Sequence, residues 1–385
     1  MKFKDNYLSY VLVYGGYYFA MAMFSVLISI YLMDLGFSAA SVSFLISVSC
    51  ICSMVLQPVI GMLQDRYNSK VVTVILMTLS GISGLTFMVH RAYPFLVLFY
   101  SLTLGLLNGV NPYVERMATA SPYSYRSVRI WGTIGFAVGS QSAGLLYENL
   151  FPGSVYLAFF IFILASAFGV LNTKTTAETK PPENKSRAGA RQILTNRKFL
   201  YYLLLASMLY AVTNLNSTYL PVLLQREGVS VSLISTITFL QTLMEFPVIF
   251  LAPYYMDRLS NNRLMGILFL LLCIQFGVYA LVPSAAVQMA VSVMTKAVVT
   301  MAFVMVSLKI VSAIISPHYQ LTALTLVSAL SKNFTTIVMQ NIGGAIVDSL
   351  SVSRLFLIMA GISLAGLLLS CLIRLPDTRR EKMFS

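Results

Sequence analysis

Three ionisable side chains lie inside long apolar stretches of the sequence: Glu245, Lys296 and Lys332. An ionised group at the centre of a hydrocarbon layer costs about 2.5–3.5 kcal/mol on insertion scales. Left unpaired, the three would together cost on the order of 10 kcal/mol, which is comparable with the stability of a whole domain. We therefore expect them to face an aqueous cavity or one another, either as a structural ion pair with a spare lysine or as a site for a solute and a coupling ion.

Polar and aromatic residues extend these charges into stripes at helical spacing. The stripes are Lys296, Thr300, Phe303 and Ser307; Lys332, Thr336 and Gln340; Gln241 and Glu245; Asn108, Asn111 and Glu115; Tyr210, Asn214 and Ser217; and Tyr10, Tyr14, Tyr17 and Tyr18. Amides, hydroxyls and tyrosines suit a polyhydroxylated or nucleoside-like solute, whereas a purely lipophilic solute would not need these donors. An aromatic stripe is also typical of packing or interfacial anchoring, so the tyrosines have two interpretations.

The elements that carry these residues must be membrane helices. The chain has 385 residues, of which 58% are hydrophobic and only 10% charged. Soluble domains have about 25% charged residues, so a soluble enzyme is excluded. Runs this long differ from the short alternating segments of an outer-membrane barrel. Because a membrane helix with its loop takes roughly 32 residues, the chain has room for about twelve.

Breaks at charges, prolines and asparagines divide the chain into spans. They are predicted at 7–33, 39–63, 70–89, 94–117, 127–148, 154–172, 199–224, 231–256, 263–283, 286–313, 318–347 and 353–374. The sequence thus predicts an all-α membrane protein with a six-helix bundle at 1–172, a basic cytoplasmic linker at 173–198, and a second six-helix bundle with a short cytoplasmic tail at 199–385. The first apolar run is too long for a cleaved signal peptide and is expected to be retained.

Lysine and arginine residues gather on one side of the predicted membrane. Cytoplasmic loops carry such an excess, so we expect the linker and both termini to be cytoplasmic in the inner (plasma) membrane. This topology accounts for the net charge of +13, and nucleic-acid binding is not expected. The cysteines Cys50, Cys52, Cys273 and Cys371 lie in apolar runs without metal-ligand spacing, so no metal site or cofactor is expected.

The sequence contains an internal repeat at half its length. Asp65 and Arg66 follow the second span, and Asp257 and Arg258 follow the eighth, 192 residues later. The first of these loops, GMLQDRYNSK, resembles the loop 2–3 signature of the major facilitator superfamily, and the resemblance extends over the whole chain. It implies two pseudo-symmetric six-helix halves. The four residues are predicted to form a cytoplasmic gate, in which each carboxylate accepts from the amides that begin a span of the other half. These residues could instead belong to ordinary cytoplasmic loops, in which the arginines follow the positive-inside rule and each aspartate lies in a turn.

The stretch YRSVRIWGTIGF at 125–136 is similar to the start of the fifth span in the lactose-permease-like branch of that superfamily, which holds oligosaccharide and nucleoside proton symporters. The resemblance implies that Glu115 and Arg129 hold the solute and Phe136 stacks on it, since forked guanidinium groups and carboxylates bind vicinal hydroxyls. Arg126 and Arg129 could instead be cytoplasmic basic residues that fix the orientation of the chain in the membrane, or parts of a gate. Spans 1, 4, 7 and 10 line the central cavity of this fold. The other residues implied to bind substrate are Tyr14, Tyr17, Asn108, Asn111, Asn214 and Lys296.

The stretch MEFPVIF at 244–250 resembles an E-x-P-x-x-F pattern on the eighth span of the same branch. Glu245 is therefore predicted to carry the proton, with Lys296 and Lys332 as coupling partners, because protonation would release a lysine from pairing and create two charge states. The sequence also departs from lactose permease. The tenth span of this chain has only Lys296, where lactose permease has a histidine and a glutamate. Phe136 of this chain stands where lactose permease has a tryptophan. A galactoside is therefore not the expected solute.

These observations favour proton-coupled uptake of a small polar solute, such as a sugar, oligosaccharide or nucleoside, by alternating access. We expect a monomer in the lipid bilayer, with protons and a small molecule as its partners. One alternative is a proton-linked efflux antiporter of drugs or metabolites, which usually has a Gly-Pro…Gly-Gly hinge that the fifth span lacks. A further alternative is a membrane sensor that does not transport. An enzyme is not expected, because no nucleophile-base or metal-ligand constellation is present.

Overall fold

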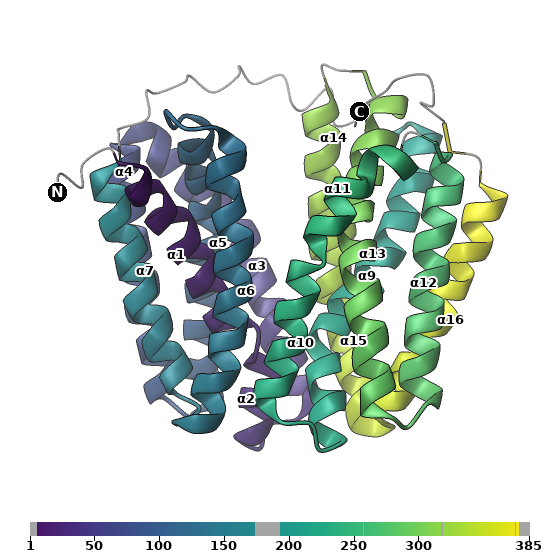
Figure 1. Cartoon of the computed structure of the whole chain (residues 1–385), viewed down its shortest axis with the longest axis horizontal. Helices are drawn as coiled ribbons and strands as arrows, with labels where there is room; N and C mark the ends of the chain where they lie inside the picture. The colour runs from purple at the N-terminus through teal and green to yellow at the C-terminus, as the bar shows by residue number, and fades with distance from the viewer. Residues whose placement is uncertain (1–5, 174–192, 257, 317–318, 374, 377–385) are drawn as a thin grey trace. The chain divides into compact units, whose positions relative to one another are not determined.

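The computed structural model describes all residues except 1–5, 174–192, 257, 317–318, 374 and 377–385 (Figure 1). The described helices form two compact units. The first contains α1 (Tyr7–Ser25), α2 (Ile28–Asp34), α3 (Ala39–Arg66), α4 (Ser69–Val89), α5 (Tyr93–Thr119), α6 (Tyr125–Asn149), α7 (Ser154–Asn172) and α10 (Val231–Leu243). The second contains α9 (Arg197–Arg226), α11 (Glu245–Met256), α12 (Asn261–Leu281), α13 (Ala285–Ile314), α14 (Gln320–Leu326), the π-helix η2 (Val327–Phe334), α15 (Thr335–Ser349) and α16 (Val352–Leu372).

The helices begin and end close to the predicted boundaries, because many of the apolar runs begin next to a residue whose side chain caps a helix. Side chains of Ser38, Asn68, Ser124, Asn196, Ser260 and Ser351 accept from backbone N–H groups of the first helical turn. Such caps satisfy donors that have no partner within the helix. The described residues contain no strand, which confirms the all-α prediction.

Ten segments of the described chain are long and apolar enough to cross a membrane, fewer than the twelve spans predicted. The fifth predicted span is α6, whose glycines, serines, glutamine and charges dilute its apolar residues. The eleventh is divided among α14, η2 and α15, none of which reaches 18 residues. The first difference therefore comes from polar composition and the second from the division of one span into shorter helices.

Two of the predicted spans contain helical irregularities next to charged residues. The eighth span is interrupted at Met244, directly before Glu245, so that it forms α10 and α11. In the eleventh, the wider π-helical turns of η2 include Lys332, and the Thr335 hydroxyl donates to the carbonyl oxygen of Leu330, 3.3 Å away. Single π turns within α-helices are frequent at functional sites.

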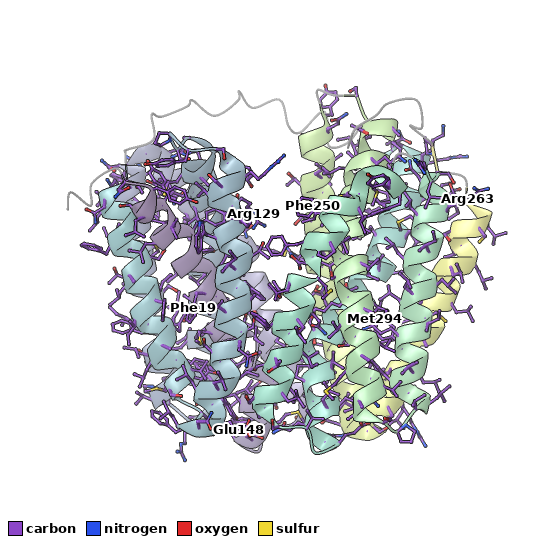
Figure 2. All side chains as sticks on the ribbon, viewed as in Figure 1. Phe19, Arg129, Glu148, Phe250, Arg263 and Met294 are labelled. Carbon is purple, nitrogen blue, oxygen red and sulfur yellow. The ribbon has the colours of Figure 1, made fainter. Side chains whose placement is uncertain are left out.

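The helix α10 groups with the first unit because it packs closely on α6. A Cβ at Gly144 would lie 2.3 Å from the Ser235 hydroxyl oxygen, so only glycine permits this approach. At the end of α6, the Glu148 carboxylate accepts from the backbone N–H of Ser232, 2.8 Å away, in the first turn of α10 (Figure 2). A carboxylate at this place is stabilised by the helix dipole.

Close glycine contacts also bring α1 against α6. A Cβ at Gly135 would lie 2.3 Å from the carbonyl oxygen of Gly15, and one at Gly139 would lie 2.7 Å from that of Phe19. Small residues allow this backbone approach in membrane helices. The contact sets the distance between α6 and the tyrosines of α1.

We expect Gly135→Ala to lower the thermal unfolding midpoint in detergent, because its Cβ would overlap backbone atoms that have no flexible side chain to move aside. Overpacking of this kind typically costs 1–3 kcal/mol. The control is Gly361→Ala, since no atom lies within 4 Å of the added Cβ there. Equal midpoints for the two variants would contradict the assigned contact between α1 and α6.

Candidate functional site

The site in the first unit centres on the carboxylate of Glu115, near the end of α5. Its Oε1 atom accepts from the hydroxyls of Tyr14 and Tyr18, at 2.6 and 3.0 Å. Its Oε2 atom accepts from the hydroxyl of Tyr125, the first residue of α6, at 3.1 Å. Three tyrosines from two helices therefore hold one half-buried carboxylate in place. Hydrogen bonds to a charged acceptor are stronger than those between neutral groups, so this cluster is well ordered.

Arg129 supplies the positive charge of this site, one helical turn after Tyr125 (Figure 2). Its guanidinium carbon lies 5.8 Å from the ring centroid of Tyr14 and 5.6 Å from that of Tyr18. It also donates to the Thr133 hydroxyl at 3.5 Å and interacts electrostatically with Glu115. A guanidinium over aromatic rings is attracted by their π faces, and its donors can bind an oxygen of a ligand.

The structure brings some predicted residues of this unit to Glu115 and places others elsewhere. Asn111 reaches the cluster by donating to the Tyr18 hydroxyl at 3.5 Å. Tyr17 is buried and donates to the carbonyl oxygen of Leu107 at 2.8 Å. Asn108 donates to the Ser53 hydroxyl at 3.0 Å. Phe136 is half-buried on α6, directly after Gly135.

Tyr18 and Tyr125 belong to the site, although the sequence analysis named neither as a binding residue. The available signal was their spacing, since Tyr18 follows Tyr14 by one turn and Tyr125 precedes Arg129 by one turn. Trp131 lies nearby on α6 and donates from Nε1 to the Tyr7 hydroxyl at 2.9 Å. That hydroxyl donates to the carbonyl oxygen of Ser127 at 2.8 Å, so it ties the start of α1 to α6.

The second unit contains the predicted coupling residues. Glu245, at the start of α11, and Lys296, on α13, are both half-buried and interact electrostatically. Their helices pack against each other. Lys332 is exposed on η2. The structure thus pairs the predicted proton carrier with one of its two predicted lysine partners.

Asn214 takes part in a polar network between α9 and α15. Its side-chain amide donates to the Thr336 hydroxyl at 2.6 Å, and that hydroxyl donates to the carbonyl oxygen of Lys332 at 2.5 Å. One turn further, Gln340 donates to the Thr218 hydroxyl at 2.8 Å. This network fixes the part of α15 that follows the π-helix.

The predicted gate residues are only partly described. Asp65 and Arg66 are exposed at the end of α3, and Arg258 is exposed after α11. Asp257 lies outside the described residues. The buried Lys309 of α13 donates from Nζ to the carbonyl oxygens of Met256 and Leu259, at 2.6 and 3.0 Å.

Lys309 was not among the residues singled out from the sequence, and its contact with this loop was missed. Arg116 is a cation near the corresponding place in the first half, 193 residues earlier and therefore one residue off the 192-residue spacing of the repeat. Arg116 donates to the hydroxyl of Ser69, the first residue of α4, at 3.2 Å. In each unit, a cation therefore contacts residues at the connection between the second and third predicted spans of that half. In the first unit this connection joins α3 to α4, and in the second it joins α11 to α12.

The described residues contain no group of three or more histidine, cysteine, aspartate or glutamate side chains that could hold a metal ion. What the first site offers instead is one carboxylate, one guanidinium and several hydroxyls inside a membrane-helix bundle. This set can bind an uncharged solute that both donates and accepts hydrogen bonds.

Comparison with known proteins gives relatives along the whole chain. The transporter YwbF of Bacillus subtilis (strain 168) is 25% identical over 350 residues, which cover 88% of this chain and 86% of YwbF. A maltose permease of Geobacillus stearothermophilus is 22% identical over 364 residues, covering 92% of this chain and 91% of that protein. The crystal structure of the nucleoside transporter NupG superposes with a TM-score of 0.80 at 17% identity, covering 95% of this chain and 98% of that one.

These similarities confirm the predicted fold as that of a multi-pass membrane transporter of the major facilitator type. They also confirm that the chain resembles transporters and not enzymes. The model of the MFS_1 like family matches residues 7–358, which is most of the sequence. The chain therefore belongs to the MFS_1 like family.

Proposed function

We propose that the protein takes up a small polar organic solute, of the sugar, oligosaccharide or nucleoside class, together with protons. The observation that carries this proposal is the Glu115 carboxylate, held by three tyrosine hydroxyls beside the guanidinium of Arg129, which lies over the rings of Tyr14 and Tyr18. A carboxylate accepts from solute hydroxyls and a guanidinium donates to solute oxygens, so the pair suits a neutral compound with several hydroxyl groups.

The relatives support this solute class. One is described as a maltose permease and another as a nucleoside transporter, and maltose and nucleosides are both rich in hydroxyl groups. Tyr14, Tyr17, Asn108, Asn111, Phe136 and Asn214 remain proposed contributors to substrate binding. Because α1 and α6 approach each other through glycines, the position of the tyrosines around Glu115 is set by the fold.

We assign proton coupling to Glu245 and Lys296. Two opposite charges inside a bilayer stabilise each other, whereas either charge alone carries a large desolvation cost. Protonation of Glu245 would leave Lys296 without its negative neighbour, so the charge of the pair changes with each proton bound. Lys332 is a further proposed participant, and Asp65, Arg66, Asp257 and Arg258 are proposed gate residues. The proposed setting is a monomer in the cytoplasmic membrane with both termini inside.

The test is uptake of radiolabelled maltose and uridine into proteoliposomes, with a pH gradient that is acidic outside. We expect gradient-driven accumulation of at least one of the two solutes. Dissipation of the gradient with a protonophore should reduce accumulation to equilibrium. An efflux antiporter would instead expel preloaded solute when the pH gradient is reversed. Failure to move any member of a wider sugar and nucleoside panel would refute the proposed solute class.

A further inference from the structure

The two oxygen atoms of Glu115 have different surroundings. Oε1 accepts from Tyr14, which is fully buried, and from Tyr18, which is half-buried. Oε2 accepts from Tyr125, whose side chain is 43% exposed, and this bond of 3.1 Å is the longest of the three. The Tyr125 bond is therefore the one that a ligand can most readily replace.

Tyr125 and Arg129 lie on the same face of α6, separated by one helical turn. A solute hydroxyl that donates to Oε2 in place of Tyr125 would bring its neighbouring oxygen toward the guanidinium of Arg129. Vicinal hydroxyls of a sugar or a ribose have this donor and acceptor character. A solute carboxylate or phosphate does not, because it has no hydrogen to donate and would be repelled by Glu115.

We propose that the Tyr125 hydroxyl occupies the place of a solute hydroxyl when the carrier is empty, and that its displacement selects neutral vicinal diols over anions. Tyr125 thus acts as a specificity-determining residue that competes with the solute for Oε2. This inference rests on the proposed function, because it assumes that Glu115 and Arg129 bind the transported solute. The inference requires that the solute donate a hydrogen bond to Glu115. Arg129 alone would not impose this requirement, since an isolated guanidinium binds anions well.

A purely structural role for Tyr125 would have the opposite effect on binding. If its hydroxyl only held Glu115 in position, removal of that hydroxyl would weaken solute binding and raise KM. If the hydroxyl competes with the solute, its removal frees Oε2 and lowers KM. The sign of the change therefore separates the two roles.

The experiment is uridine uptake by Tyr125→Phe, with Tyr123→Phe as the matched control. Tyr123 is near in sequence and packs against the rings of Tyr7 and Tyr10. We expect KM for uridine to fall about two- to ten-fold in Tyr125→Phe, the range of one net hydrogen bond, and to stay unchanged in Tyr123→Phe. Inhibition by 2′,3′-dideoxyuridine, which lacks the vicinal hydroxyls, should improve less than inhibition by uridine. A raised or unchanged KM in Tyr125→Phe would overturn the inference while leaving the proposed function in place.

A second measurement does not depend on transport. Thermal unfolding of Tyr125→Phe, Glu115→Met and the double variant, without solute, gives their coupling by a double-mutant cycle. We expect the two shifts in the unfolding midpoint to be non-additive, and additive shifts would overturn the inference even if uptake proceeds. If the unaltered protein transports no sugar or nucleoside, the proposed function fails and this inference falls with it.

Discussion

The Glu245→Gln variant should lose proton-driven accumulation of solute while it retains exchange of labelled for unlabelled solute. Glutamine has nearly the same shape as glutamate but cannot bind and release the proton. One proton crossing a potential of 100 mV supplies about 2.3 kcal/mol, roughly fifty-fold accumulation, and this is the factor expected to disappear. Exchange needs only alternating access with solute bound, so it should continue.

The matched control for this variant is Glu227→Gln. Glu227 accepts a hydrogen bond from the Gln288 side chain at 2.7 Å and directly follows the last residue of α9, 18 residues before Glu245. We expect this control to accumulate solute normally. Because Glu245→Gln leaves Lys296 without its carboxylate neighbour, the folded fraction is checked by size-exclusion chromatography. Undiminished accumulation in a folded Glu245→Gln protein would show that the proton is carried elsewhere.

The second large effect is expected for Arg129→Lys. Lysine keeps the charge but lacks the planar fork that lies over Tyr14 and Tyr18 and can hold two oxygens. Loss of a charged hydrogen bond costs about 1.5–3 kcal/mol, so kcat/KM for uridine or maltose should fall by about ten- to a hundred-fold. The comparison is Arg126→Lys, since Arg126 is exposed three residues earlier on α6. If both lysine variants transport equally well, Arg129 serves topology alone and the binding site must be sought elsewhere.

The helices could be predicted from the sequence because membrane spans are governed by local composition. Continuous apolar residues, basic loops and capping side chains act over short distances, and they fixed most helix ends to within a few residues. The interruption at Met244 and the π-helix at Val327–Phe334 were not predicted. Hydropathy averages over many residues and is insensitive to a single irregular turn.

The charged residues of the candidate site could be predicted from the sequence, whereas the tyrosine hydroxyls that bind them were harder to predict. Glu115 and Arg129 stood out because ionisable residues are rare in such a chain and because they fit a family pattern. Tyr125 did not, since its partner is set by the packing of α5 against α6 and its position near a helix start suggested a loop residue. Lys309 is a similar case, because its role depends on carbonyl groups 50 and 53 residues earlier in the chain, which no side-chain pattern reveals.

The hydrogen bond between Trp131 and Tyr7 has a practical consequence. Trp131 is the only tryptophan of the chain, so its fluorescence originates from a single point on α6. Indole emission responds to the loss of a hydrogen bond and to entry of water. Any movement of α6 against the start of α1 that breaks this bond therefore changes the emission of the unlabelled protein.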